Sequence, residues 1–358
     1  MTCITLKFRL KDKHRRHLNR QAKSVNQVWN FCNETQQKAF RLRNSGQNTP
    51  WTDKYQLQRL TAGSYEDLGL PASSIQMVCH EYDKSRRQQK KPWLRWRTDK
   101  SLGWIPINSQ KIKFENFSFN FMGTIFYPMH YRHKLLDENT KIKCSSFNED
   151  SRGRWYINIV VEINNKINNQ KRNAVGIDLG LKNFAVASNG EEFKSNQYYR
   201  KTEKRIALLQ RAGKKSQARK LHAKIANQRR DSHHKATSYL IKRYGQIYVG
   251  DVNAKKLAQT KMAKSVNDAA WSMFRNMLRY KSIMNGVTYL EVNEQYTTQT
   301  CSSCGVISAS SPKGIEGLRI REWTCAECNT THNRDVNAAK NILRLGLQTH
   351  VGGASYLR

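Results

Sequence analysis

The sequence has no run of apolar residues long enough to span a bilayer, and this absence predicts that no segment crosses a membrane. The amino-terminal residues do not have the form of a signal peptide, so we expect no secretory leader. Neither an internal repeat nor a low-complexity tract is found. Membrane-spanning chains and repeat arrays are therefore not expected.

Acidic residues are scarce. The 358 residues include 63 Lys plus Arg but only 27 Asp plus Glu, which gives a formal net charge of +36. Such an excess destabilises a compact chain by self-repulsion unless a polyanion neutralises it. The basic residues are dispersed, with clusters at 11–16, 86–91 and 200–201. This dispersal favours a long groove for nucleic acid, and a merely solvated basic surface is the alternative.

Half of the eight cysteines have no pairing pattern, namely Cys3, Cys32, Cys79 and Cys144. We expect them to be reduced thiols, which is typical of the cytosol or the nucleus.

The other cysteines form two matched Cys-x-x-Cys pairs, Cys301 with Cys304 and Cys325 with Cys328. This spacing is typical of a zinc ribbon. Four thiolates close a tetrahedral shell and leave no open position for water, so the predicted Zn²⁺ is structural and not catalytic. Disulfides and a thioredoxin-type redox motif are the alternatives.

The first half of the chain is predicted to be a β-barrel interrupted by helices. Residues 3–9 alternate as in a strand, residues 11–91 have helical periodicity, and residues 93–163 return to short strands. Residues 164–171 have the composition of a polar linker. Trp93, Trp96 and Trp104 lie among basic residues. Such interleaving can stack bases and hold phosphates, and burial in the barrel core is the alternative.

From residue 174 onward, short apolar strands alternate with helices, which indicates an α/β sheet with its site at the carboxyl edge. Residues 265–268 have the form of a capping box that opens a helix ending at Gly286. Asp178 follows the first strand, and Asp335 stands at a predicted helix start after the cysteine pairs. Two adjacent acids repel unless a cation lies between them, and hard ions such as Mg²⁺ or Mn²⁺ prefer oxygen ligands. For a single Asp, a turn or helix cap is the alternative.

Three motifs resemble the TnpB family of transposon-encoded, RNA-guided DNA nucleases, which is related to Fanzor proteins and type V CRISPR effectors. They are Gly176-Ile177-Asp178-Leu179-Gly180, residues 296–305 around the first cysteine pair, and residues 334–342 beginning Arg-Asp-Val-Asn-Ala-Ala. The resemblance covers about half the chain. It implies an RNase H-like RuvC nuclease domain interrupted by a zinc ribbon, a guide RNA and a double-stranded DNA target.

The resemblance also implies a domain order. We predict a wedge β-barrel at 1–10 and 92–170, a helical recognition insertion at 11–91, the RuvC-like nuclease at 171–296 and 331–350, the zinc ribbon at 297–330 and a tail at 351–358.

The sequence departs from the family pattern at one acid. The family has a Glu at the end of the strand predicted at 247–249, where this chain has Gly250 followed by Asp251. Asp251 is a poor substitute because adjacent strand residues point to opposite faces. The preferred candidate is Glu294, as in Fanzor proteins and a subset of TnpB relatives. It follows the strand predicted at 287–292, which should lie beside 247–249 in an RNase H-like sheet. Glu291, or no working third acid, remains an alternative.

The resulting hypothesis is an RNA-guided DNA endonuclease in which Asp178, Glu294 and Asp335 hold two Mg²⁺ ions for phosphodiester hydrolysis. A nuclease-dead, RNA-guided DNA-binding repressor and an RNA-independent transposase are the alternatives. We expect a cytoplasmic, nucleoid-associated protein in a bacterium or a nuclear one in a eukaryote.

Overall fold

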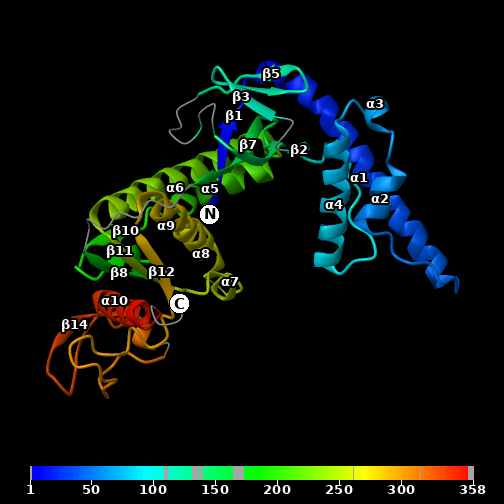
Figure 1. Ribbon diagram of the computed structural model, residues 1–358. Coiled ribbons are helices and arrows are strands. Elements are labelled where there is room, and N and C mark those ends of the chain that lie inside the picture. Colours follow the sequence, from blue (N-terminus) through cyan, green and yellow to red (C-terminus); the bar gives the residue numbers. More distant parts are fainter. Residues whose placement is uncertain are drawn as a thin grey trace. The chain divides into compact units, whose positions relative to one another are not determined.

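The computed structural model describes residues 2–108, 112–130, 136, 140–163, 173–260, 262–314 and 316–353. The chain divides into two compact units, Met1–Ile163 and Asn164–Arg358, which are described separately (Figure 1). The linker predicted at 164–171 lies outside the described residues. No helix in the described part of the chain is both long and apolar enough to cross a membrane.

The first unit contains a four-stranded antiparallel sheet with the order β1-β7-β6-β2. The strands are β1 (Thr2–Arg9), β2 (Trp104–Asn108), β6 (Ile142–Glu149) and β7 (Trp155–Ile163). Alternate residues of β7 are buried, among them Ile157, Ile159 and Val161. This period of two is the pattern of a sheet with one face toward a core.

A second, three-stranded antiparallel sheet is formed by β3 (Ile112–Glu115), β4 (Ser118–Phe121) and β5 (Thr124–Phe126). Its aromatic side chains pack on the first sheet, with 4.7 Å between the ring centroids of Phe126 and Phe147. No strand pairing joins the two sheets among the described residues, apart from an isolated bridge between Leu10 and Pro128. The predicted closed barrel is therefore corrected to two sheets that share an aromatic core.

The helices of this unit are η1 (Asp12–His14), α1 (Arg15–Asn44), α2 (Lys54–Leu60), α3 (Tyr65–Leu68) and α4 (Ala72–Gln89). The buried residues of α1 follow helical steps, including Leu18, Ala22 and Val25, so this face packs inward. Asp53 opens α2 with a capping box, which satisfies backbone N–H groups at the helix start.

The second unit is built on a five-stranded sheet with the order β10-β9-β8-β11-β12. Its strands are β8 (Ala174–Leu179), β9 (Asn183–Ala187), β10 (Glu192–Lys194), β11 (Gln246–Gly250) and β12 (Thr288–Val292). The strands β8, β11 and β12 are parallel, whereas β9 and β10 are antiparallel to their neighbours. The predicted pairing of the strand before Glu294 with the strand before Gly250 is confirmed, since Val292 lies opposite Gly250.

Helices cover both faces of this sheet. They are α5 (Tyr198–Arg211), α6 (Lys215–Arg243), α7 (Ala254–Leu257), α8 (Ala263–Ala269), α9 (Trp271–Asn285) and α10 (Arg334–Gly353). One core combines Val175 and Ile177 of the sheet with Leu240 of α6 and Phe274 of α9. On the other face, Tyr248 and Val292 pack with Ile342 of α10. Alternate residues of the strands therefore face different helices.

The segment between β12 and α10 contains the ribbon elements η3 (Glu316–Arg319), β13 (Glu322–Thr324) and β14 (Thr331–Asn333). The two strands form an antiparallel hairpin that leads directly into α10. Helix α10 runs to Gly353, past residue 350, where the nuclease segment is predicted to end.

The helix predicted to begin with a capping box at residues 265–268 is instead two helices. Ala270 adopts a left-handed conformation, with φ of 51°, between α8 and α9. Asp268 accepts a hydrogen bond from the Tyr199 N–H at 2.9 Å and pairs with Arg229 at 2.8 Å. Its carboxylate therefore fixes the start of α5 and does not complete a capping box of its own helix. Gly286 ends α9 as predicted.

Candidate active site and metal centre

Asp178 lies near the carboxyl end of β8, the central strand of the sheet. It is two residues after Gly176, so both belong to the strand face that α10 covers. A Cβ atom at Gly176 would lie only 2.1 Å from the Ala339 carbonyl oxygen. Glycine is thus required for the close approach of the helix backbone, and this contact brings the start of α10 to the strand that carries Asp178.

Glu294 lies beyond the end of β12, and its carboxylate reaches over Gly250 of the neighbouring strand. A Cβ atom at Gly250 would be 2.8 Å from Glu294 Oε2 and 3.2 Å from Ile342 Cδ1. The Glu294 side chain therefore occupies the space above Gly250 that a side chain at position 250 would take. The backbone N–H of Glu294 also donates to Asp251 Oδ1 at 3.2 Å, which ties the two strand ends together.

Glu291 is held on the α9 side of the sheet. Its carboxylate pairs with Arg275 at 3.2 Å and with Arg279 through a short contact, and it accepts a hydrogen bond from the Tyr289 hydroxyl at 3.0 Å. These partners come from α9 and β12, whereas Asp178 and Gly250 belong to the α10 face. This geometry favours Glu294 over Glu291 as the third acid.

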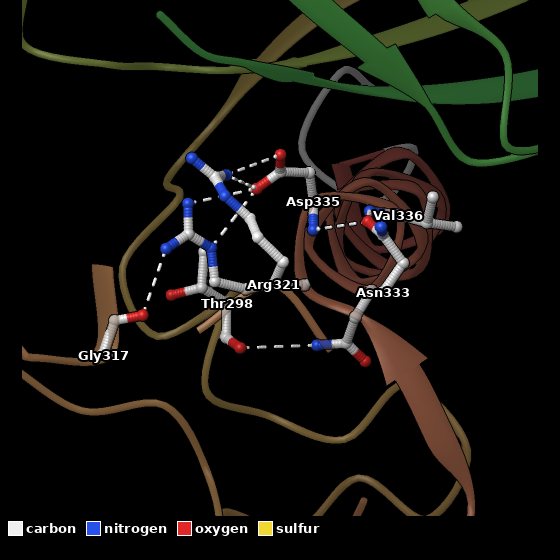
Figure 2. A network of polar contacts seen from close by, with 8 residues as sticks. Thr298, Gly317, Arg321, Asn333, Asp335 and Val336 are labelled. Carbon is white, nitrogen blue, oxygen red and sulfur yellow. Dashed lines mark hydrogen bonds and ion pairs between the residues drawn. The ribbon is translucent and has the colours of Figure 1, made fainter. Parts of the chain in front are cut away.

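Asp335 stands in the first turn of α10, where Asn333 caps the helix. Asn333 Oδ1 accepts hydrogen bonds from the N–H groups of Asp335 at 3.1 Å and Val336 at 3.2 Å (Figure 2). This cap satisfies donors that have no partner within the helix. The cap therefore fixes the backbone from which the Asp335 carboxylate extends.

Two arginines bind the Asp335 carboxylate. Arg321 Nη1 donates to its two oxygens at 3.2 and 3.0 Å (Figure 2), and Arg334 donates to Oδ1 through Nε at 3.2 Å and Nη2 at 3.1 Å. Arg334 also donates to the Gly317 carbonyl oxygen at 3.1 Å. Since Gly317 and Arg321 belong to the ribbon segment, these contacts join the ribbon to Asp335.

The electrostatics of the site reflect three crowded acids. Burial and then the negative charges of Asp335 and Glu294 raise the pKa of Asp178 to about 7, although the positive charge of Arg334 opposes the rise. Burial and the charge of Asp251 likewise raise the pKa of Glu294 to about 7, against the charge of Arg275. Each shift means that the ionised carboxylate is disfavoured in the absence of a cation.

The three carboxylates are close enough to interact but do not enclose a single ion. In the described part of the chain, the four paired cysteines are the only group of three or more His, Cys, Asp or Glu side chains whose ligand atoms all lie within 4.8 Å of one another. The carboxylate oxygens of the three acids therefore do not all lie within this distance of one another. Their oxygen donors are those that Mg²⁺ and Mn²⁺ prefer.

Cys301, Cys304, Cys325 and Cys328 form the second candidate metal centre. The Sγ–Sγ distances are 3.6 Å for Cys301 with Cys328 and 3.8 Å for Cys304 with Cys325. A tetrahedral ion with bonds of about 2.3 Å to sulfur requires sulfur atoms about 3.8 Å apart, whereas a disulfide requires about 2.05 Å. The cluster is therefore consistent with the predicted zinc ribbon, and the disulfide alternative does not fit these distances.

Three residues with no predicted role, Asn337, Asn341 and Arg321, make contacts at the site. Asn337 Nδ2 donates to the Thr300 carbonyl oxygen at 2.8 Å, and its Oδ1 accepts from the Ser302 N–H at 2.8 Å. Asn341 Nδ2 donates to the same Thr300 oxygen at 2.6 Å. Their i, i+4 spacing, which places them on one helix face, could have indicated this role. No comparable sequence signal distinguishes Arg321.

Two family models match segments within residues 158–342 of the chain. Residues 158–261 match the family model described as a probable transposase of the OrfB_IS605 type, and residues 271–342 match the Cas12f1-like TNB domain.

Two curated relatives illustrate the match. A Streptomyces pristinaespiralis protein named "Putative RNA-guided DNA endonuclease" is 31% identical over 232 residues, which cover 61% of this chain and 56% of the relative. The TnpB-like protein L770 of Acanthamoeba polyphaga mimivirus is 27% identical over 257 residues, covering 64% of this chain and 48% of the relative. The chain thus spans about half the length of these relatives.

A solved structure, the cryo-EM structure of the Cas12f1-sgRNA-target DNA complex, aligns with a TM-score of 0.40 and 15% identity, covering 96% of this chain and 99% of that one. Residues 158–261 and 271–342 of this chain are therefore similar to the OrfB_IS605 and Cas12f1-like TNB family models, and the chain is similar to relatives named RNA-guided DNA endonuclease and TnpB-like protein.

Proposed function

We propose that this protein is an RNA-guided DNA endonuclease that hydrolyses phosphodiester bonds with two divalent ions. The observation that carries the proposal is that Asp178 of β8 lies close enough to Glu294 and to Asp335 of α10, from two distant parts of the chain, for their charges to act on it. Burial, and then the charges of the other two acids, raise the pKa of Asp178, and perturbed carboxyl groups of this kind are typical of functional sites. The names of the relatives support the nucleic-acid substrate.

The three carboxylates would hold the ions, which supply an activated water and stabilise the leaving oxygen when bound. The chain's own contribution is positioning. Gly176 sets the distance between strand and helix, and Gly250 leaves room for the Glu294 carboxylate. Because the pKa values of Asp178 and Glu294 lie near 7, each must give up a proton before it becomes a full ligand. We therefore expect activity to rise with pH through neutrality.

The net charge of +36 supports a large polyanionic partner. We propose that guide RNA and the target duplex neutralise this charge, so that binding weakens steeply as salt increases. The guide would select the target by base pairing, while the protein holds the paired strands through their backbones. The fit of Glu294 over Gly250 also supports the proposed likeness to the Fanzor-type subset with a relocated Glu.

A second candidate function is guided binding without cleavage. The observation that favours it is the engagement of Asp335 by Arg321 and Arg334, together with the absence, among the described residues, of an acid group tight enough for a single ion. In this case the protein would act as a repressor.

One experiment separates these functions. The protein is purified with its bound RNA and offered a DNA duplex that matches the guide, with Mg²⁺. Cleavage that is lost in Asp178→Ala, Glu294→Ala and Asp335→Ala but retained in Glu291→Ala supports the nuclease. Glu291 is the matched control because its carboxylate is ion-paired on the α9 side. Tight guided binding without cleavage by the unmodified protein supports the repressor, and the absence of bound RNA supports an RNA-independent transposase.

A further inference from the structure

An extended segment of the first unit displays an exposed tryptophan. Residues 91–98 follow α4 and have no regular secondary structure. Within them, Trp96 keeps 41% of its surface exposed, and its side chain makes no hydrogen bond or ring contact with a described residue. Single exposed aromatic residues are common on protein surfaces, so the importance of Trp96 depends on the groups that surround it. Trp93, by contrast, packs edge-on against Phe40 with 5.1 Å between ring centroids.

The segment that carries Trp96 is held rigidly on α1. Asn33 Oδ1 accepts from the Leu94 N–H at 2.7 Å, and Asn30 exchanges two hydrogen bonds of 2.8 Å with the backbone of Arg97. Trp29 Nε1 donates to the Arg95 carbonyl oxygen at 3.3 Å. Since these partners lie on both sides of Trp96 along the chain, the ring projects from a fixed backbone and loses little entropy on binding a ligand.

A hollow of about 470 Å³ lies at this position, lined by Trp29, Leu94, Trp96 and Leu102 together with the polar groups of the segment. Leu102 is also exposed, at 53%. The volume is within the range of small-ligand sites. The hollow therefore combines aromatic and aliphatic side chains with polar and basic groups in its lining.

Three basic side chains line the hollow, and they have different roles. Arg97 is used internally, because its guanidinium donates to Asn26 Oδ1 and to the Leu102 carbonyl oxygen. Arg95 and Lys100 line the same hollow and are exposed. Their side chains make no hydrogen bond or ion pair with any described residue. One arginine thus stabilises the segment, and two further cations remain available to an anionic ligand.

We propose that this hollow binds an unpaired nucleobase of a single-stranded nucleic acid. The base stacks on the Trp96 indole, and Arg95 and Lys100 bind the flanking phosphates. An aromatic ring beside cations is the combination that holds single strands without reading their sequence. A paired base is already stacked in its duplex and has no free face, so the hollow discriminates single strands from duplexes. This site is formed by residues of the first unit alone, whereas the three acids belong to the second unit, and the proposal does not depend on cleavage.

Binding of short oligonucleotides to the full chain tests the proposal. Fluorescence anisotropy with labelled single-stranded RNA, single-stranded DNA and a duplex of the same length gives three affinities for each variant. Trp96→Ala should weaken single-strand binding about tenfold and leave duplex binding unchanged, whereas Trp96→Phe should retain most of the affinity. The RNA and DNA arms show which strand the site prefers. Tyr65→Ala is the matched control, because Tyr65 is an aromatic residue of the same unit with 46% exposure outside this hollow.

Two further readouts locate the contact. Oligonucleotides carrying bromouracil should crosslink to Trp96, as mapped by mass spectrometry. Removing the charge of Arg95 or Lys100 should reduce the salt dependence of single-strand binding, because each phosphate contact releases counterions. Unchanged single-strand affinity in Trp96→Ala, or equal weakening for single strands and duplex, would overturn the proposal. These outcomes are independent of guided cleavage, so a failure here leaves the proposed function to be judged on its own assay.

Discussion

Replacing Asp178 by Asn should make the metal-free protein more stable at alkaline pH, although it removes a proposed catalytic group. The pKa of Asp178 is raised from 3.8 to about 7, a shift of about three units worth about 4 kcal/mol at 1.36 kcal/mol per unit. Because Asp178 is half-buried and its neighbours can relax, we expect about half of this, roughly 2 kcal/mol. For a unit of this size, that corresponds to an increase of about 4–8 °C in melting temperature.

The direction in which stability changes with pH follows from proton binding. A carboxyl whose pKa is higher in the folded than in the unfolded protein binds more protons when folded, so stability falls as pH rises between the two values. The wild-type protein should therefore lose stability relative to Asp178→Asn from about pH 4 to about pH 7, and the difference should level off above that. Burial lowers the pKa of His233 to about 4, which also affects stability in this range. Both proteins retain His233, so its contribution cancels in the difference.

Thermal melting in a chelator-free buffer without divalent ions, followed from pH 5 to pH 8.5, measures this difference. Asp231→Asn is the control, because Asp231 is an exposed acid paired with Lys235 on α6. Addition of Mg²⁺ should then stabilise the wild-type protein by about 2.7 kcal/mol at a hundredfold excess over the dissociation constant and should stabilise Asp178→Asn much less. If Asp178→Asn melts at or below the wild-type temperature at pH 8, the acids are not crowded and the reasoning fails.

Three further predictions concern the parts that surround Asp178. Gly250→Ala should reduce cleavage about a hundredfold by displacing the Glu294 carboxylate. Gly250→Glu combined with Glu294→Ala should restore part of the cleavage activity. Equal activity of Gly250→Ala and wild type in a cleavage assay would contradict the fit of the Glu294 carboxylate over Gly250. Cys301→Ser, or treatment with a strong chelator, should lower the melting temperature, because metal binding contributes folding energy to the ribbon; an unchanged melting curve would remove the zinc assignment. Arg321→Gln should raise the affinity for Mn²⁺ about threefold, measured by electron paramagnetic resonance, because a guanidinium no longer competes for Asp335; unchanged or weaker binding would show that Arg321 does not compete.

The sequence predicts local features of the sheet unit well. The apolar strand before Asp178 follows from a short-range pattern, and the strand pairing that brings Glu294 beside Gly250 follows from the resemblance to an RNase H-like sheet; both are seen. The two cysteine pairs predict that their four thiolates form one cluster, because each Cys-x-x-Cys places two thiolates on one side of a turn. Strand pairing alone does not explain the proximity of Glu294 to Gly250. The Glu294 carboxylate can lie over position 250 because Gly250 has no side chain.

Other features depend on contacts that no local pattern encodes. The predicted barrel fails because alternation identifies strands but not whether their edges join. The apparent capping box at residues 265–268 fails because Asp268 has better partners in α5 and α6 than in its own helix. The binding of Asp335 by Arg321 requires a ribbon loop to fold back on α10, and the sequence separation alone gives no hint of it.

The contacts of Asn337 and Asn341 have a consequence for how such proteins diversify. These side chains fasten the chain where it leaves the sheet for the ribbon, and the cap at Asn333 fixes the point of return. Both ends of the ribbon segment are thus anchored on helix α10. Apart from Gly317 and Arg321, which contact Arg334 and Asp335, the ribbon segment between them can gain, lose or exchange residues during evolution while the ends that precede and follow it stay in place.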